Sequence, residues 1–96
     1  MHIISKKTLK DFWEKHPDSE GPLKVWFKIV HATRYVGYND LKATFNSIDK
    51  VGDKIVFNIG GNKYRLITAI HFNYGRVYVR HVMTHGEYDK KEWGNG

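Results

Sequence analysis

Two arginines in the second half of the chain have the residue type and the spacing to bind a phosphate. Arg65 lies in the segment 63–72 and Arg80 in the segment 77–84, and both segments alternate as β-strands do. If the two arginines face the same side of a sheet, their like charges repel, and an anion between them would relieve that repulsion. A planar guanidinium matches the oxygens of a phosphate. The alternative is two exposed strand arginines whose stems pack along the sheet.

Strict alternation along these two segments predicts the neighbours of each arginine. It places Arg80 on one face together with Tyr78, Val82 and Thr84. By the same rule, Arg65 shares its face with Ile67, Ala69 and His71. Whether these two faces are the same side of the sheet decides between the anion site and its alternative.

His85 and Tyr88 follow the last predicted strand, and they are residue types that move protons near neutral pH. They are three residues apart, so on a helical turn they would share one side, where Asp89 would orient either of them. The unperturbed pKa of histidine is about 6.5, and nearby cations would lower the pKa of Tyr88 by favouring its phenolate. The alternative is a tail in which Tyr88 and Trp93 only pack against the sheet edge.

Two amphipathic helices precede the strands that carry the arginines. Apolar residues recur with helical spacing after Ser5, which we expect to cap a first helix that ends before Pro17. The same spacing returns over residues 20–33, which predicts a second helix antiparallel to the first. The stripe formed by Trp13, Trp26 and Phe27 has the spacing of core residues.

The apolar period changes from 3.6 to two in the second half of the chain. This change predicts three antiparallel strands at 54–59, 63–72 and 77–84, with tight turns at Gly60-Gly61-Asn62 and at 73–76. We predict a brief strand at 2–4, an irregular stretch at 34–53 with room for one helical turn at 41–45, and a polar loop or frayed helical turn at 85–93. The result is one α+β domain over residues 1–96, with two N-terminal helices packed on an antiparallel sheet of three to four strands.

The charge distribution points to a polyanionic partner. Sixteen Lys and Arg residues against ten Asp and Glu residues give the 96-residue chain a formal net charge of +6. No acidic residue occurs between Asp53 and Glu87, so positive charge is concentrated in the segment that carries the candidate site. Nucleic acid is the first candidate for such a partner.

Several classes of protein are excluded by what the sequence lacks. It contains no cysteine, no apolar stretch of the about 18 residues that a membrane helix needs, and no apolar leader at the N-terminus. Its six histidines lack the paired spacing of metal ligands. We therefore expect a cytoplasmic protein that does not bind membranes and that uses no metal and no cofactor.

Three segments of the chain together carry a family resemblance. They are residues 41–45, residues 56–66 with the run Asn-Ile-Gly-Gly-Asn, and residues 77–89 with the run Thr-His-Gly-Glu-Tyr-Asp. These segments are similar to those of the HigB-type toxins of bacterial type II toxin–antitoxin modules, within the RelE/ParE superfamily. The similarity runs nearly end to end, and it implies the RelE-like fold of two helices on an antiparallel sheet.

The resemblance implies an mRNA interferase, a toxin that is an endoribonuclease. Such toxins cut mRNA, generally on the ribosome, and a helix-turn-helix antitoxin of the HigA type holds them inactive. Operator DNA is then contacted only through the antitoxin. The reaction needs no metal, because the 2′-OH of the RNA attacks the adjacent phosphorus while cationic side chains stabilise the added negative charge.

The resemblance also implies roles for particular residues. Arg65 and Arg80 would hold the scissile phosphate, and His85 and Tyr88 would be the candidates for proton transfer. Contacts to flanking phosphates would come from the basic residues Lys54, Lys63, Arg76, Lys90 and Lys91.

Two other functions are compatible with the same residues. A ParE-type toxin shares the fold and poisons a topoisomerase through protein contacts, leaving mRNA intact. A non-catalytic RNA-binding module would instead stack bases on the aromatic residues of its basic strands, which are Tyr64, Phe72, Tyr74 and Tyr78.

Overall fold

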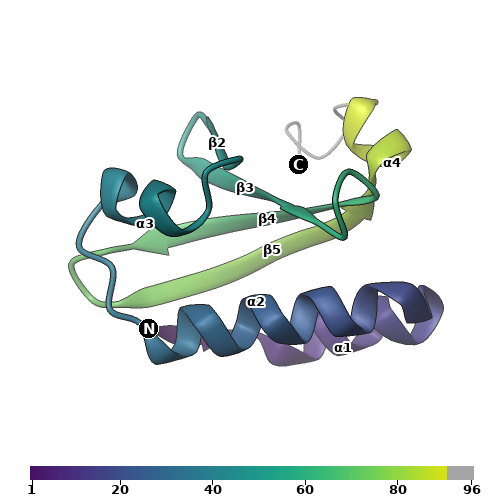
Figure 1. The fold of residues 1–96 in the computed structure, drawn as a ribbon, viewed down its shortest axis with the longest axis horizontal. Helices are drawn as coiled ribbons and strands as arrows, with labels where there is room; N and C mark the ends of the chain where they lie inside the picture. The colour runs from purple at the N-terminus through teal and green to yellow at the C-terminus, as the bar shows by residue number, and fades with distance from the viewer. Residues whose placement is uncertain (91–96) are drawn as a thin grey trace.

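Two helices lie along one side of a five-stranded sheet in the computed structural model, which describes residues 1–90 (Figure 1). The strands are β1 (His2–Ile4), β2 (Asp49–Val51), β3 (Lys54–Ile59), β4 (Tyr64–His71) and β5 (Arg76–Thr84). The helices are α1 (Lys6–Lys15), α2 (Glu20–Ala32), α3 (Tyr38–Thr44) and α4 (His85–Asp89), with a short 3₁₀ helix, η1, at Pro17–Ser19.

The sheet is mixed, which corrects the prediction of a purely antiparallel sheet of three to four strands. Its strand order is β1-β5-β4-β3-β2, and β1 runs parallel to β5 while every other pair is antiparallel. The brief strand at 2–4 is present, but its alternation could not reveal its partner. Strand β2 was missed because all three of its residues are exposed, so it carries no apolar period. The α+β class is confirmed.

Helices α1 and α2 form where the apolar spacing predicted them. Leu9 and Trp13 of α1 and Leu23, Trp26 and Val30 of α2 are buried, as the period of 3.6 requires. Ser5 occupies the N-cap position of α1, but its side chain makes no capping hydrogen bond. None of the helices within residues 1–90 is long and apolar enough to cross a membrane.

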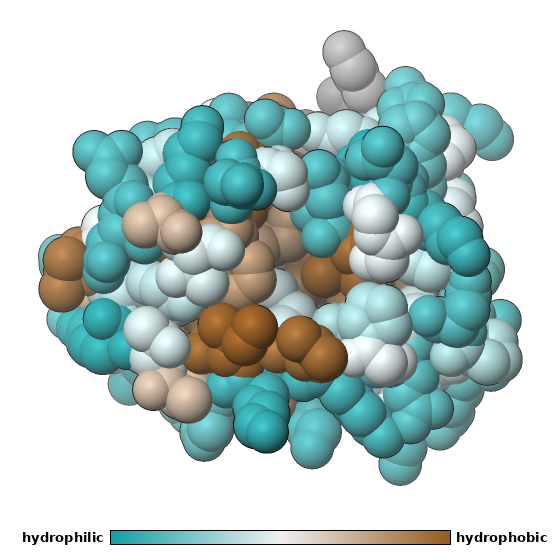
Figure 2. Space-filling model, viewed as in Figure 1, coloured by the Kyte–Doolittle hydropathy of each residue, from teal (hydrophilic) through white to brown (hydrophobic). Residues whose placement is uncertain are grey.

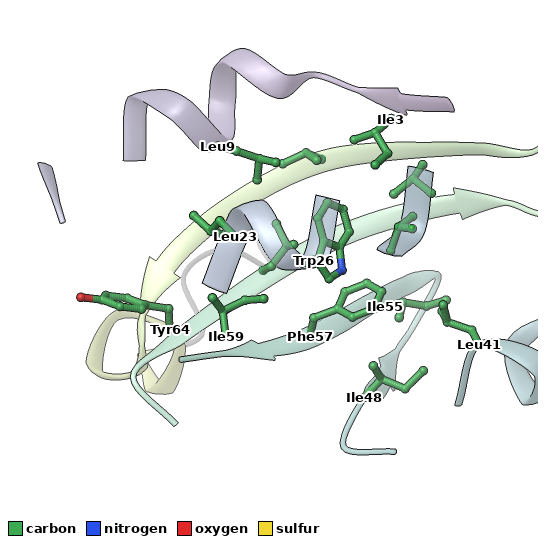
Figure 3. Packing of buried hydrophobic residues seen from close by; sticks show 14 of the residues in the cluster. Ile3, Leu9, Leu23, Trp26, Leu41, Ile48, Ile55, Phe57, Ile59 and Tyr64 are labelled. Carbon is green, nitrogen blue, oxygen red and sulfur yellow. The ribbon is translucent and has the colours of Figure 1, made fainter. Parts of the chain in front are cut away.

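The core lies between these helices and the inner face of the sheet (Figure 3). The ring of Trp26 meets that of Phe57 edge to face, with the ring centroids 5.3 Å apart. Helix α3, longer than the single predicted turn, adds Leu41, which is fully buried. Burial of each such side chain contributes about 1.5–3 kcal/mol to the stability of the packing between helices and sheet.

An apolar groove opens on the side of the molecule that carries α2. Figure 2 shows apolar side chains gathered at the centre of this side. The groove lies between α2 and β3, and its lining includes Pro22, Val25, Ile29, Phe45 and Ile59. Arg65 is not among the residues that line this groove.

A β-bulge in β5 changes the predicted neighbours of Arg80. Ile67 pairs with His81 and Thr68 with Val79, so Arg80 is the extra residue that pairs with neither. Arg80 shares its face with Tyr78 as predicted. The prediction that Val82 and Thr84 lie on that same face is wrong, because it assumed strict alternation through the bulge.

The bulge puts the two ends of β5 out of phase. Val82 packs against the core, whereas Tyr78 pairs with Ala69 on the opposite face, which we call the outer face. Arg65 belongs to the outer face as well, because it alternates with Tyr64 and Leu66 of the core.

Candidate active site

Arg65 is a buried cation at the start of β4. Its side chain is held by two hydrogen bonds from Nη1, to the backbone carbonyls of Asn62 and Tyr64, each 3.2 Å long. The residue is only 8% exposed, and it forms no ion pair with any Asp or Glu of residues 1–90. A guanidinium stays charged at all ordinary pH values, so its burial without a carboxylate favours the binding of an anion beside it.

His85 lies between Arg65 and Asp89. Nη2 of Arg65 is 2.9 Å from Nδ1 of His85, and Nε2 of the same ring is 3.1 Å from a carboxylate oxygen of Asp89. Because a guanidinium can only donate, Nδ1 must be the acceptor, and the ring proton belongs on Nε2, facing Asp89. The hydrogen bonds thus select one neutral tautomer of His85.

Helix α4 is held at its start by a capping box. The hydroxyl of Thr84 accepts from the backbone N–H of Glu87 at 3.2 Å, and the Glu87 carboxylate accepts from the N–H of Thr84 at 2.9 Å. That backbone N–H is also the main reason why the pKa of Glu87 lies below its ordinary value. The N–H of His85 donates to the carbonyl of Lys63 at 2.9 Å, which ties α4 to the β3–β4 turn.

The start of α4 has a signature in the sequence that apolar periodicity does not detect. A Thr followed three residues later by Glu is the signature of a capping box, and Thr84 and Glu87 have that spacing. The helical turn brings His85, Tyr88 and Asp89 to one side, since they stand at i, i+3 and i+4.

Tyr88 packs against the guanidinium of Arg65. The centroid of its ring is 5.6 Å from Cζ of Arg65, within the range of a cation–π contact. Burial raises the pKa of Tyr88 above its ordinary value, the charges of Asp49 and Asp89 raise it further, and the charge of Arg65 opposes them. The expectation that nearby cations would lower this pKa is therefore wrong, because desolvation of the phenolate outweighs the attraction of one arginine.

Arg80 lies on the same side of the sheet as Arg65, but on the neighbouring strand β5 and further from α4. Its Cζ is 5.3 Å from the ring centroid of Tyr78, which lies on the outer face. The charge of Arg80 also acts on Asp53, since Lys54 first and Arg80 more weakly lower the pKa of its carboxyl. The structure thus brings Arg65, His85 and Tyr88 together and sets Arg80 beside Tyr78.

The predicted phosphate-contacting residues are dispersed. Lys54 pairs with Asp53 at 2.7 Å, and Lys63 pairs with Asp18 at 3.3 Å. Arg76 begins β5 at the end of the sheet opposite α4, and Lys90 follows α4 directly. Lys91 and Trp93 lie outside the described residues.

The four aromatic residues that a non-catalytic RNA-binding module would use to stack bases lie in different environments. The Tyr64 ring is buried, and its hydroxyl donates to the Asp18 carboxylate, which raises the pKa of Tyr64. Phe72 packs against the core. Tyr78 lies on the outer face, and Tyr74 is 73% exposed in the β4–β5 turn.

The cluster of Arg65, His85, Tyr88 and Asp89 combines an anion-binding cation with two groups able to move protons. Among the described residues, no three His, Asp or Glu side chains gather as metal ligands would. Such a cluster can bind one phosphate and transfer protons on either side of it.

Comparison with known proteins identifies relatives over nearly the full chain. Residues 19–91 match the family described as HigB_toxin, the RelE-like toxic component of a toxin–antitoxin system. The chain is 40% identical over 92 residues to the mRNA interferase toxin HigB of Escherichia coli strain K12, covering 93% of this chain and 88% of that protein. It is 32% identical over 93 residues to the mRNA interferase HigB of Escherichia coli O6:H1, covering 94% and 90% of the two chains.

Proposed function

This chain belongs to the family of HigB toxins, the RelE-like toxic components of toxin–antitoxin systems, and we propose that it cleaves mRNA without a metal. The observation that carries the mechanism is the cluster of Arg65, His85 and Tyr88. Two relatives named mRNA interferases, each covering more than nine-tenths of the chain, support the activity.

Arg65 binds the scissile phosphate in the proposed reaction. Its guanidinium is buried, fixed by two carbonyls and not paired with a carboxylate within residues 1–90. As the 2′-oxygen attacks, negative charge builds on the phosphoryl oxygens, and the guanidinium that has bound the phosphate stabilises this charge. Arg80, further along the same face, is placed to contact a neighbouring phosphate.

His85 serves as the general base. Nδ1 accepts from Arg65 before substrate arrives, and a bound phosphate competes for the same donor. Once the guanidinium turns to the phosphate, Nδ1 is released to take the proton of the 2′-OH. Asp89 holds Nε2 and stabilises the imidazolium that forms. His85, oriented by Asp89, therefore becomes available as a base only when substrate binds.

Tyr88 serves as the general acid. Its raised pKa keeps the phenol protonated at neutral pH, which is the form an acid requires. The bond from the 2′-oxygen to phosphorus forms, the bond from phosphorus to the 5′-oxygen breaks, and Tyr88 gives its proton to that leaving oxygen. The products are a 2′,3′-cyclic phosphate and a 5′-hydroxyl, and solvent takes the proton from the His85 imidazolium and returns one to the Tyr88 phenolate.

The cellular setting follows from the family. A toxin of a toxin–antitoxin system has a cognate antitoxin, and we propose that here it is a helix-turn-helix protein of the HigA type. Through that antitoxin the complex would reach operator DNA. Ribosome-bound mRNA is the proposed substrate.

Mapping of transcript ends after induced expression tests the proposal. We expect new 5′-hydroxyl ends within coding regions in cells that express the wild-type chain, and none with Arg65→Ala. Lys10→Ala is the matched control, since Lys10 is an exposed cation of α1. Intact transcripts together with a DNA-damage response would instead identify a ParE-type toxin and reject the proposal. Adding purified ribosomes to, or omitting them from, a reaction with purified toxin decides the dependence on the ribosome.

A further inference from the structure

We propose that the outer face carries a base-stacking subsite for single-stranded RNA, formed by Tyr78, His71 and Tyr74 at the end of the sheet remote from α4. The inference rests on the proposed function and extends it, because it assigns a second place where the RNA is held. The base that stacks there belongs to a nucleotide several positions away from the scissile phosphate.

The three rings form one continuous cluster. The centroid of the His71 ring lies 5.3 Å from that of Tyr78, at an interplanar angle of 86°, and 6.5 Å from that of Tyr74. Strand register explains the contact, since Tyr78 pairs with Ala69, two residues before His71 on the same face of β4. His71 and Tyr74 are exposed, so ring surface is available to a base.

The surroundings of the cluster are cationic. Arg80 lies over the Tyr78 ring, and Arg76 pairs directly with His71. His2 pairs with Arg76 from the neighbouring strand. The four polar residues of this surface, His2, His71, Arg76 and Arg80, are all exposed. Besides Lys54, the main cause, Arg80 weakly lowers the pKa of the exposed Asp53. Aromatic rings beside arginines are the combination with which proteins hold single-stranded nucleic acid.

The position of the cluster relative to the active site sets the length of RNA between them. Arg65 and His71 are six residues apart on β4, which corresponds to roughly 20 Å along the strand. Stacked bases are about 3.4 Å apart, and an extended strand covers roughly twice that per nucleotide, so the stacked base lies about three to six nucleotides from the scissile phosphate. Both sites lie on the same face, so one strand of RNA reaches both.

Fluorescence quenching of 2-aminopurine tests the subsite. The probe is a short RNA built around a mapped cleavage site, with a 2′-O-methyl group that blocks attack and one 2-aminopurine moved from position to position. We expect strong quenching at one position about three to six nucleotides from the blocked linkage with the wild-type protein. Tyr78→Trp should keep the quenching. Tyr78→Ala should abolish it and weaken binding about fivefold or more.

Variants of exposed residues separate loss of base stacking from loss of folding, because their side chains are not part of the core. His71→Ala removes a solvent-exposed ring and should also reduce the quenching. His31→Ala is the matched control, because His31 is an exposed histidine that stacks on Phe27 of α2, with ring centroids 5.7 Å apart. This control should leave the quenching unchanged.

The outcomes separate the two proposals. Unchanged quenching in both Tyr78→Ala and His71→Ala, or no quenched position in the wild type, overturns the subsite while transcript cleavage still stands. Absence of transcript cleavage by the wild-type chain overturns the proposed function instead.

Discussion

Nη2 of Arg65 lies 2.9 Å from Nδ1 of His85, so the arginine occupies the lone pair with which a neutral imidazole would accept a proton. The free protein therefore holds its candidate base in a blocked state. In the proposed reaction, a phosphate that binds Arg65 has two effects at once, because it brings the substrate into place and releases Nδ1. Anion binding at Arg65 and the availability of His85 as a base are therefore coupled.

Replacing Arg65 should abolish cleavage. Loss of one preorganised donor to a developing oxyanion typically lowers the rate about 10²- to 10³-fold, and Arg65→Ala also leaves the phosphate without its buried cation. Arg65→Lys should recover little, since an ammonium cannot bond two carbonyls and a phosphate in the same fork geometry. Cleavage of ribosome-bound mRNA measures the effect, and circular dichroism verifies the fold. Full activity in Arg65→Lys would contradict the planar recognition of the phosphate.

Tyr88→Phe should lower cleavage about 10²- to 10⁴-fold while leaving RNA binding nearly intact, because only the proton donor is removed. The raised pKa means that the phenolate of Tyr88 forms only above the ordinary value of 10.0. Ultraviolet titration of the wild type minus Tyr88→Phe should therefore show one tyrosine that ionises above that pH. A difference spectrum that titrates below pH 10 would contradict a role as an acid.

Thr84 should act as a positioning residue for His85 through the capping box. Thr84→Ala should destabilise the start of α4 by about 1 kcal/mol and lower kcat for cleavage. Thr84→Ser keeps the hydroxyl that accepts from Glu87 and should restore activity. Hydrogen exchange of the α4 amides and the cleavage rate measure the two effects. Equal losses in Thr84→Ser and Thr84→Ala would refute the positioning role.

The Asp18–Tyr64 hydrogen bond should make folding stability depend on pH in the acid range. Tyr64 and then Lys63 lower the pKa of Asp18, so its ionised form is favoured in the folded state. A depressed folded pKa gives stability that is present above the unfolded value of about 3.9 and that is lost as pH falls through the folded pKa.

Asp18→Asn should therefore flatten the fall in melting temperature below pH 4 and lower the melting temperature at pH 7. Asp11→Asn is the matched control, since Asp11 is an exposed carboxylate that pairs with Lys7 on α1. Identical acid profiles in the wild type and Asp18→Asn would contradict the assigned pKa.

Periodicity alone predicted α1, α2 and the three central strands, because backbone geometry imposes periods of 3.6 and two wherever one face is buried. The turn at Gly60 and Gly61 could also be predicted from the sequence. The two residues adopt φ values of 62° and 70°, which few residues other than glycine tolerate. The basic segment without acidic residues, and the candidate residues at positions 65, 85 and 88, could also be identified from the sequence, since they are local properties of the chain.

Long-range pairing and burial decided the rest. No local pattern reveals that β1 joins β5 in parallel, or that one extra residue at Arg80 reverses the alternation of β5. The tautomer of His85 depends on a donor 20 residues away, and the pKa of Tyr88 rises because folding removes water from its ring. The strand pairing, the bulge, the tautomer and the pKa all depend on contacts between segments far apart in the sequence, and only the tertiary structure determines those contacts.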